Sequence, residues 1–175
     1  KAFGPGHVIA NPVYHDGRIY IGTGRDHYYT SHPGGRIATP GVFLCLDATD
    51  PRDISREDII WEKRIVVTQS TASVKDGLVY VSDGTGIIHC LDANTGETYW
   101  EHDMGGDVTC RSQILADGKV YIGTDRERFY IFEDSRAKNI LFEAELDGRT
   151  STLGAVDGFL VVATERSIRA YEPQN

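Results

Sequence analysis

The chain has 175 residues, of which 40% are hydrophobic and 25% are charged, and its formal net charge is -8. This size and composition suit one globular domain with a hydrophobic core. The acidic balance, without a run of Lys and Arg, argues against nucleic-acid binding, and no apolar run approaches the length that spans a bilayer. The 19 glycines and the prominent Val, Ile and Tyr favour strands and turns over helices.

An Asp-Gly pair followed by an alternating apolar strand recurs along the chain. The four copies are DGRIYIGT from Asp16, DGLVYVSD from Asp76, DGKVYIGT from Asp117 and DGFLVVAT from Asp157. The last three are spaced by about 40 residues. Asp-Gly forms tight turns because Gly adopts positive φ at little cost. Each copy therefore predicts a turn that leads into a strand.

Further extended segments accompany each of these strands. One lies just before each Asp-Gly pair. The strands that follow the Asp-Gly strands end at Asp47, Asp92, Asp134 and Glu172. In the first three repeats another strand comes next, around Trp61, Trp100 and Phe142. Four short antiparallel strands in about 40 residues are typical of a β-propeller blade, so the sequence predicts an all-β propeller with four such repeats.

The predicted repeats cover about residues 7–65, 66–105, 106–147 and 148–175 of a single propeller segment, 1–175. The last repeat has no segment for its outer strand. The first repeat is stretched by an insertion over about residues 25–41, between its Asp-Gly strand and the next one. An open arc of blades would expose two apolar faces and an unpaired strand edge, which favours association with other protein.

The stretch LDANTGETYW, which ends at Trp100, resembles the consensus of PQQ-like propeller repeats, in which an Asp-Ala-x-Thr-Gly turn precedes a Trp. LDATDPRDISREDIIW resembles the same element with an insertion, and EDSRAKNILF has lost the Thr-Gly and the Trp. The chain as a whole is similar to the C-terminal part of bacterial PQQ-binding-like propeller proteins. That resemblance implies a periplasmic, secreted or cell-surface location and a ring of seven or eight blades.

The blade count has a consequence for assembly. Four blades correspond to half of such a ring, so we expect the chain to be the C-terminal half of a larger propeller or to assemble with another chain. A closed ring of four blades is the alternative.

The motif residues have structural interpretations of their own. The carboxylate of Asp92 can accept backbone N–H groups of the turn, and Thr95 can do the same more weakly. Gly96 suits a left-handed position that closes the turn. Trp100 is expected to fill the wedge between neighbouring blades. Asp47 and Trp61 hold the equivalent positions in the first repeat.

A quinoprotein would need more than this motif. Resemblance to PQQ dehydrogenases implies a cofactor on the propeller axis and a Ca²⁺ held by Glu, Asn and Asp. It also implies an Asp that acts as the base and, often, a disulfide between two adjacent Cys residues. This sequence has no Cys-Cys pair. Cys45 and Cys90 occupy one position in successive repeats, which predicts buried free thiols in the strand core, whereas Cys110 lies elsewhere. The sequence predicts no catalytic residue, no metal ligand and no cofactor, with PQQ and Ca²⁺ required only by the oxidoreductase alternative.

Small polar residues are expected along the propeller axis. Five residues before each Asp-Gly pair stand Asn11, Thr71, Ser112 and Thr152. Such side chains suit hydrogen bonds to backbone and water. Arg111, one position earlier, is the exception, and it can bind an anion at the channel or pair with an acidic neighbour.

The insertion carries the most distinctive side chains, namely His27, Tyr28, Tyr29, His32 and Arg36. The two His residues do not have the spacing of a common metal site, so a contact surface for a partner or ligand is favoured. Three functions stay open on this evidence. The first is a non-catalytic scaffold or protein-interaction module, the second is a fragment of a PQQ-dependent oxidoreductase, and the third is a module that binds surface glycans or polymers.

Overall fold

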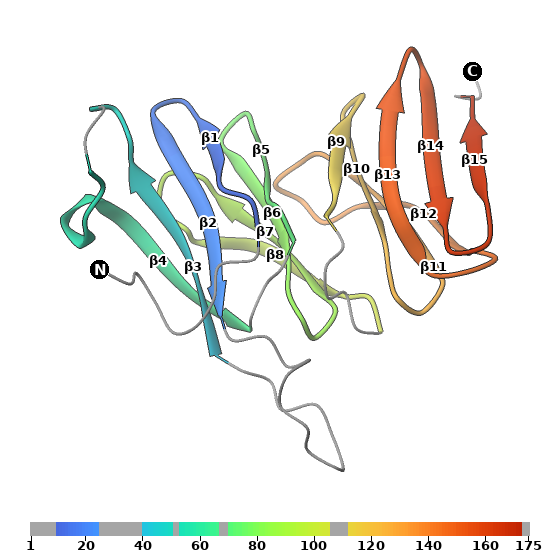
Figure 1. Cartoon of the computed structure of the whole chain (residues 1–175), viewed down its shortest axis with the longest axis horizontal. Coiled ribbons are helices and arrows are strands. Elements are labelled where there is room, and N and C mark those ends of the chain that lie inside the picture. Colours follow the sequence, from blue (N-terminus) through green and yellow to red (C-terminus); the bar gives the residue numbers. More distant parts are fainter. Residues whose placement is uncertain (1–9, 25–39, 51–52, 67–69, 106–111, 173–175) are drawn as a thin grey trace, which may run out of the picture.

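The computed structural model describes residues 10–24, 40–50, 53–66, 70–105 and 112–172. These residues form four antiparallel sheets of consecutive strands, here called blades 1 to 4 (Figure 1). Blade 1 contains β1 (Val13–His15), β2 (Arg18–Gly24), β3 (Pro40–Asp47) and β4 (Ile59–Val66), with the short 3-10 helix η2 (Arg56–Asp58) before β4. Blade 2 contains β5 (Ser73–Lys75), β6 (Leu78–Ser82), β7 (Ile87–Asp92) and β8 (Thr98–Asp103).

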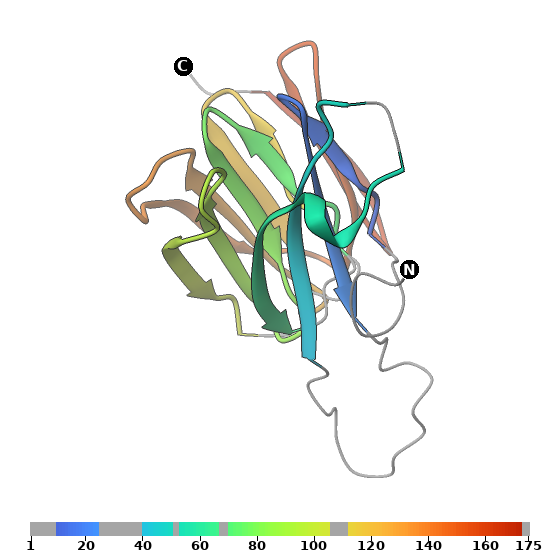
Figure 2. The ribbon, with the colours of Figure 1, turned by 90° about the vertical axis from the view of Figure 1, so that its left-hand side faces the viewer.

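Blades 3 and 4 follow in the same order. Blade 3 contains β9 (Ile114–Ala116), β10 (Lys119–Gly123), β11 (Arg128–Glu133) and β12 (Ile140–Glu145). Blade 4 contains β13 (Thr150–Val156), β14 (Phe159–Thr164) and β15 (Ile168–Tyr171). Figure 2 shows that the sheets lie face to face, one behind another. The predicted all-β propeller fold is confirmed, and no helix among the described residues is long and apolar enough to cross a membrane.

The Asp-Gly turns have the geometry that the sequence predicts. Both residues of each pair have positive φ, with values of 48° and 78° at Asp76 and Gly77 and of 48° and 81° at Asp157 and Gly158. Two consecutive positive φ angles define the type I′ turn, whose twist matches that of the flanking strands. The recurring Asp-Gly pair therefore fixes each hairpin at the first turn of its blade.

One predicted position in blade 3 was wrong by a single residue. Leu78 pairs with Asp92 in blade 2, whereas Lys119, the residue equivalent to Leu78, pairs with Glu133. Glu133, and not Asp134, is therefore the acidic residue that ends this strand. Asp134 instead donates its backbone N–H to the carbonyl of Gly118, as Ala93 does to Gly77. Two adjacent acidic residues made the alignment ambiguous, and strand pairing resolves it.

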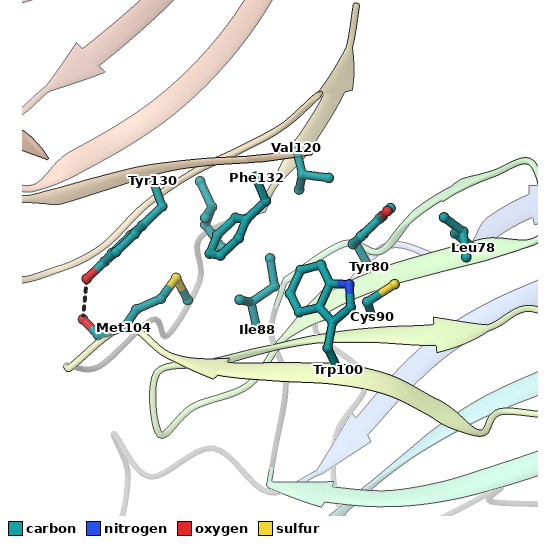
Figure 3. Close-up of a cluster of buried hydrophobic side chains, with 10 residues drawn as sticks. Leu78, Tyr80, Ile88, Cys90, Trp100, Met104, Val120, Tyr130 and Phe132 are labelled. Carbon is teal, nitrogen blue, oxygen red and sulfur yellow. Dashed lines mark hydrogen bonds between the residues drawn. The ribbon is translucent and has the colours of Figure 1, made fainter. Parts of the chain in front are cut away.

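Each pair of neighbouring blades encloses its own hydrophobic cluster. Figure 3 shows the cluster between blades 2 and 3, where Tyr80, Cys90 and Trp100 of blade 2 face Phe132 of blade 3. A second cluster, with Trp61 and Leu91, lies between blades 1 and 2, and a third lies between blades 3 and 4. The core is thus a series of layers between sheets, as face-to-face packing of β-sheets requires.

Cys45 and Cys90 are free and fully buried in these layers, as the sequence predicts. Burial raises the pKa of both thiols, and that of Cys90 to about 12. We expect both to resist alkylation in the folded protein at mildly alkaline pH, because few thiolates form and the reagent cannot reach them. Mass spectrometry of a Cys110→Ser variant after iodoacetamide treatment checks this. Rapid labelling without denaturant would contradict the packing described.

Candidate protein-interaction site

The tryptophan of blade 1 docks on the turn of blade 2. The indole Nε1 of Trp61 donates to the carbonyl of Ala93 at 3.0 Å, and its ring lies 6.0 Å from that of Tyr20. Gly96 has φ +73°, and a Cβ built on it would come within 2.6 Å of the Trp61 ring. The turn therefore requires glycine at position 96 for two reasons, namely the positive φ of its backbone and the close approach of the Trp61 indole.

The remaining residues of this motif shape the turn itself. Asp92 Oδ1 accepts the backbone N–H groups of Asn94 at 2.7 Å and Thr95 at 3.0 Å, and Tyr99 donates to Asp92 Oδ2. The hydrogen bond from Tyr99 is the main reason why the pKa of Asp92 lies below its usual value. Asp47 accepts from Thr49 in the same way in blade 1. These residues build the surface on which the neighbouring tryptophan rests.

Trp100 repeats this docking between blades 2 and 3. Its Nε1 donates to the carbonyl of Ser135 at 3.1 Å, and its ring stacks on Phe132 at 5.3 Å (Figure 3). Tyr80 supports it by donating to the carboxylate of Asp134 at 2.8 Å, in the place where Tyr20 donates to the carbonyl of Ala93. The motif tryptophans therefore join blade 1 to blade 2 and blade 2 to blade 3, whereas Phe142, the equivalent residue of blade 3, is 51% exposed.

A histidine between two carboxylates lies in blade 2, and the sequence analysis missed it. His89 Nε2 lies 3.0 Å from Asp83 Oδ2, and His89 Nδ1 lies 3.0 Å from Glu101 Oε1. Burial alone would raise the pKa of Asp83, but hydrogen bonds from His89 and Thr85 outweigh it, and the pKa lies below its usual value. The other blades have Thr23, Thr124 and Thr164 at the position of Asp83, so the signal in the sequence was a departure from the repeat.

Polar side chains do connect the innermost strands. Thr71 donates its backbone N–H to Ser112 Oγ at 2.9 Å, and Ser73 Oγ donates to the carbonyl of Gln113 at 3.0 Å. Gln113 Nε2 in turn donates to the carbonyls of Thr71 and Tyr80, both at 2.8 Å. The hydrogen-bonding role of Gln113 was not predicted, because equivalent residues in other repeats, such as Ala72, are apolar and do not indicate a polar position. In the described part of the axis, these groups satisfy backbone groups and one another.

All residues that the sequence indicated as candidate ligand or partner contacts lie outside the described residues. They are His27, Tyr28, Tyr29, His32, Arg36 and Arg111. Among the residues that the structure does describe, no three His, Cys, Asp or Glu side chains come together in a way that could hold a metal ion.

Blade 4 presents an apolar face that the other blades bury. Its side turned away from blade 3 carries Val156, Phe159, Val161, Ile168 and Ala170, here called the blade-4 outward face. Ile168 is 79% exposed, whereas its equivalents Phe43 and Ile88 are 1% and 0% exposed. At the opposite end of the arc, Leu44 and Leu46 lie on the side of blade 1 that is turned away from blade 2. Both side chains are buried, unlike Ile168 on the outward side of blade 4. Exposed apolar side chains also lie on β12 of blade 3, at Ile140, Leu141 and Phe142. The blade-4 outward face differs from them because its equivalents in the other blades are buried, and β15 lies at the margin of the molecule (Figure 1).

Comparisons with known proteins agree with this geometry. The family described as outer membrane protein assembly factor BamB matches residues 41–111. The chain is 26% identical over 121 residues to the quinohemoprotein alcohol dehydrogenase of Comamonas testosteroni, an alignment that covers 62% of this chain and 17% of the enzyme. It is 30% identical over 98 residues to the lupanine 17-hydroxylase (cytochrome c) of a Pseudomonas species, which covers 55% of this chain and 14% of the relative.

The crystal structure of BamB from Moraxella catarrhalis superposes with a TM-score of 0.68 at 18% identity, over 94% of this chain and 46% of BamB. Fold, repeat motif and these similarities define a β-propeller made of PQQ-like repeats. The chain accordingly has a β-propeller fold, and its repeats are similar to PQQ-like repeats. It spans less than half the length of BamB and a much smaller share of the two enzymes.

Proposed function

We propose that this chain is a non-catalytic propeller scaffold that assembles with another protein chain through the blade-4 outward face. The exposure of Ile168 carries the proposal, because the same position is 1%, 0% and 4% exposed at Phe43, Ile88 and Phe129. A face with the side chains of a blade interface gains free energy when another protein covers it. A partner that presents a similar face is the best match.

Two further observations support this function. The motif residues Asp92, Gly96 and Trp100 shape a turn and the contacts between blades, which favours a structural role for the motif. The matching family is described as an outer membrane protein assembly factor, which favours a scaffold over an enzyme. Its name also supports a location at the cell envelope, in the periplasm or outside the cell.

The second candidate is a segment of a PQQ-dependent oxidoreductase, which the two enzyme relatives favour. Reconstitution with PQQ and Ca²⁺, followed by quinone absorbance and dye-linked oxidation of alcohols, tests whether this chain has such an activity by itself. The scaffold proposal expects no turnover above that of free PQQ. Saturable turnover by this chain would contradict it.

Sedimentation velocity over a range of protein concentrations tests the assembly itself, with a second copy of the chain as the available partner. We expect a reversible assembly larger than the 19.4 kDa chain, which Ile168→Glu abolishes. Ile60→Glu is the matched control, since Ile60 is 42% exposed on blade 1. A stable monomer at every concentration, or equal loss in both variants, would contradict assembly through this face.

A further inference from the structure

His102 is a partly buried histidine at the joint between blades 2 and 3. It lies on β8, two residues after Trp100, and its ring packs edge-on against those of Tyr130 and Phe132, both at 5.3 Å. Phe132 is also the residue on which Trp100 stacks, so two rings of β8 rest on one residue of blade 3 (Figure 3). His102 therefore lines the same joint as the motif tryptophan.

The hydrogen bonding of this ring favours the neutral imidazole. Its Nε2 atom is buried and has no hydrogen-bond partner among the described residues. An added proton turns both ring nitrogens into donors, and a buried N–H without an acceptor costs free energy, the more so in a charged group. His89 of the same blade has the opposite environment, because both of its nitrogens lie 3.0 Å from carboxylate oxygens. Of these two rings, that of His102 has a site suited to the neutral form.

The charged groups around His102 act in both directions. Lys138 donates to a backbone carbonyl of β8 at 3.2 Å and so holds a second cation beside the ring. Glu143 of β12 and Asp103 of β8 act against it, and Glu143 is itself paired with Arg128. Burial has the largest effect and the charge of Lys138 adds to it, so the pKa of His102 lies below its usual value of 6.5.

The equivalent residues of blades 1 and 3 do not have this property. Strand pairing places His102 opposite Ile88, as it places Lys63 opposite Phe43 in blade 1. Lys63 extends to a hydroxyl group on β8, whereas blade 3 has the small residue Ala144 at this position. A titratable ring packed between two blades is therefore a departure of blade 2 from the repeat, and the fold does not require it.

We infer that His102 makes the joint between blades 2 and 3 sensitive to pH, because protonation at mildly acidic pH releases its ring from Tyr130 and Phe132 and exposes Trp100. The folded chain binds this proton more weakly than the unfolded chain does. The contribution of His102 to stability is therefore complete above about pH 6.5 and declines as the pH falls below that value. The joint does not involve blade 4, so this switch is independent of assembly through the blade-4 outward face.

Quenching of Trp100 fluorescence by acrylamide tests the switch. A Trp61→Phe variant of the full chain leaves Trp100 as its only tryptophan, and Phe is the residue that blade 3 has at this position, Phe142. We expect the quenching constant to be at least about twofold larger at about pH 5 than at about pH 7.5, because the opened joint takes up the proton. Adding His102→Ala, which gives β8 the residue of blade 3, should remove this difference.

Lys138→Gln is a second variant, and it leaves His102 unchanged. It should reduce the rise in quenching at acidic pH, because the closed joint then tolerates the charged ring better, whereas a purely structural role of the ring predicts no such effect. His15→Ala is the matched control, since His15 lies on β1 in blade 1. Circular dichroism verifies that each variant is folded, and if His102→Ala is not, Lys138→Gln decides. No rise in acid, or an equal rise with and without the tested substitution, would overturn the inference.

Discussion

Gly96→Ala is expected to lower the free energy of unfolding by about 3 kcal/mol. The added Cβ would lie 2.6 Å from the Trp61 ring, and φ at this position is +73°. Chemical denaturation followed by circular dichroism measures the loss. Gly77→Ala in the same blade is the matched control, because φ is +78° there and no atom lies within 4 Å of the added Cβ. Gly77→Ala should lower the free energy of unfolding by only about 1 kcal/mol.

A double-mutant cycle isolates the contact between the two blades. In a Trp61→Ala background the collision disappears, so Gly96→Ala should then cost no more than Gly77→Ala. An equal cost of Gly96→Ala in both backgrounds would show that the indole does not rest on this turn.

His89→Leu is expected to destabilise the protein by about 3 kcal/mol, because it removes the partner of a buried carboxylate. Asp83 is 2% exposed and its Oδ2 lies 3.0 Å from His89 Nε2. The repeats supply the compensating change, since blade 1 has Thr23 and Leu44 at these two positions. The Asp83→Thr, His89→Leu double variant should therefore recover most of the stability. Thermal and chemical unfolding measure both variants, and a double variant weaker than His89→Leu alone would contradict this account.

Acid should remove the contribution of this pair. The folded state holds the pKa of Asp83 below the usual value of 3.8. A depressed pKa stabilises the fold at pH values above the unfolded pKa, and the contribution is lost as the pH falls through the folded pKa. We therefore expect the difference in the free energy of unfolding between the original chain and the double variant to change little above about pH 5. At about pH 3 the original chain should lose stability relative to the double variant. Unfolding curves at the two pH values check this, and an unchanged difference would exclude Asp83 as the titrating group.

The repeat was the strongest signal in the sequence, and it predicted the fold well. Asp-Gly pairs such as Asp76-Gly77 define type I′ turns through local backbone preferences, so their effect is visible without tertiary context. The same periodicity placed Trp100 between blades, where the structure has it against Phe132. Local conformation and period sufficed for these features.

Contacts that depend on the register between strands were harder to predict. The third repeat carries Glu133 next to Asp134, and only the pairing of Lys119 identifies which of them ends the strand. His89 meets Asp83 and Glu101 because three segments of blade 2 converge on one side of the sheet. Residues brought together from separate strands leave no spacing in the sequence that would reveal them.

The central claim is that the blade-4 outward face is a protein interface, and alkylation of an engineered cysteine at position 168 tests it most directly. In a Cys110→Ser background, Ile168→Cys should react rapidly in the dilute chain and become protected as the concentration rises and the chains assemble. Ile88→Cys, at the equivalent but fully buried position, should stay protected throughout. A rate of alkylation at position 168 that is fast and independent of concentration would contradict the account.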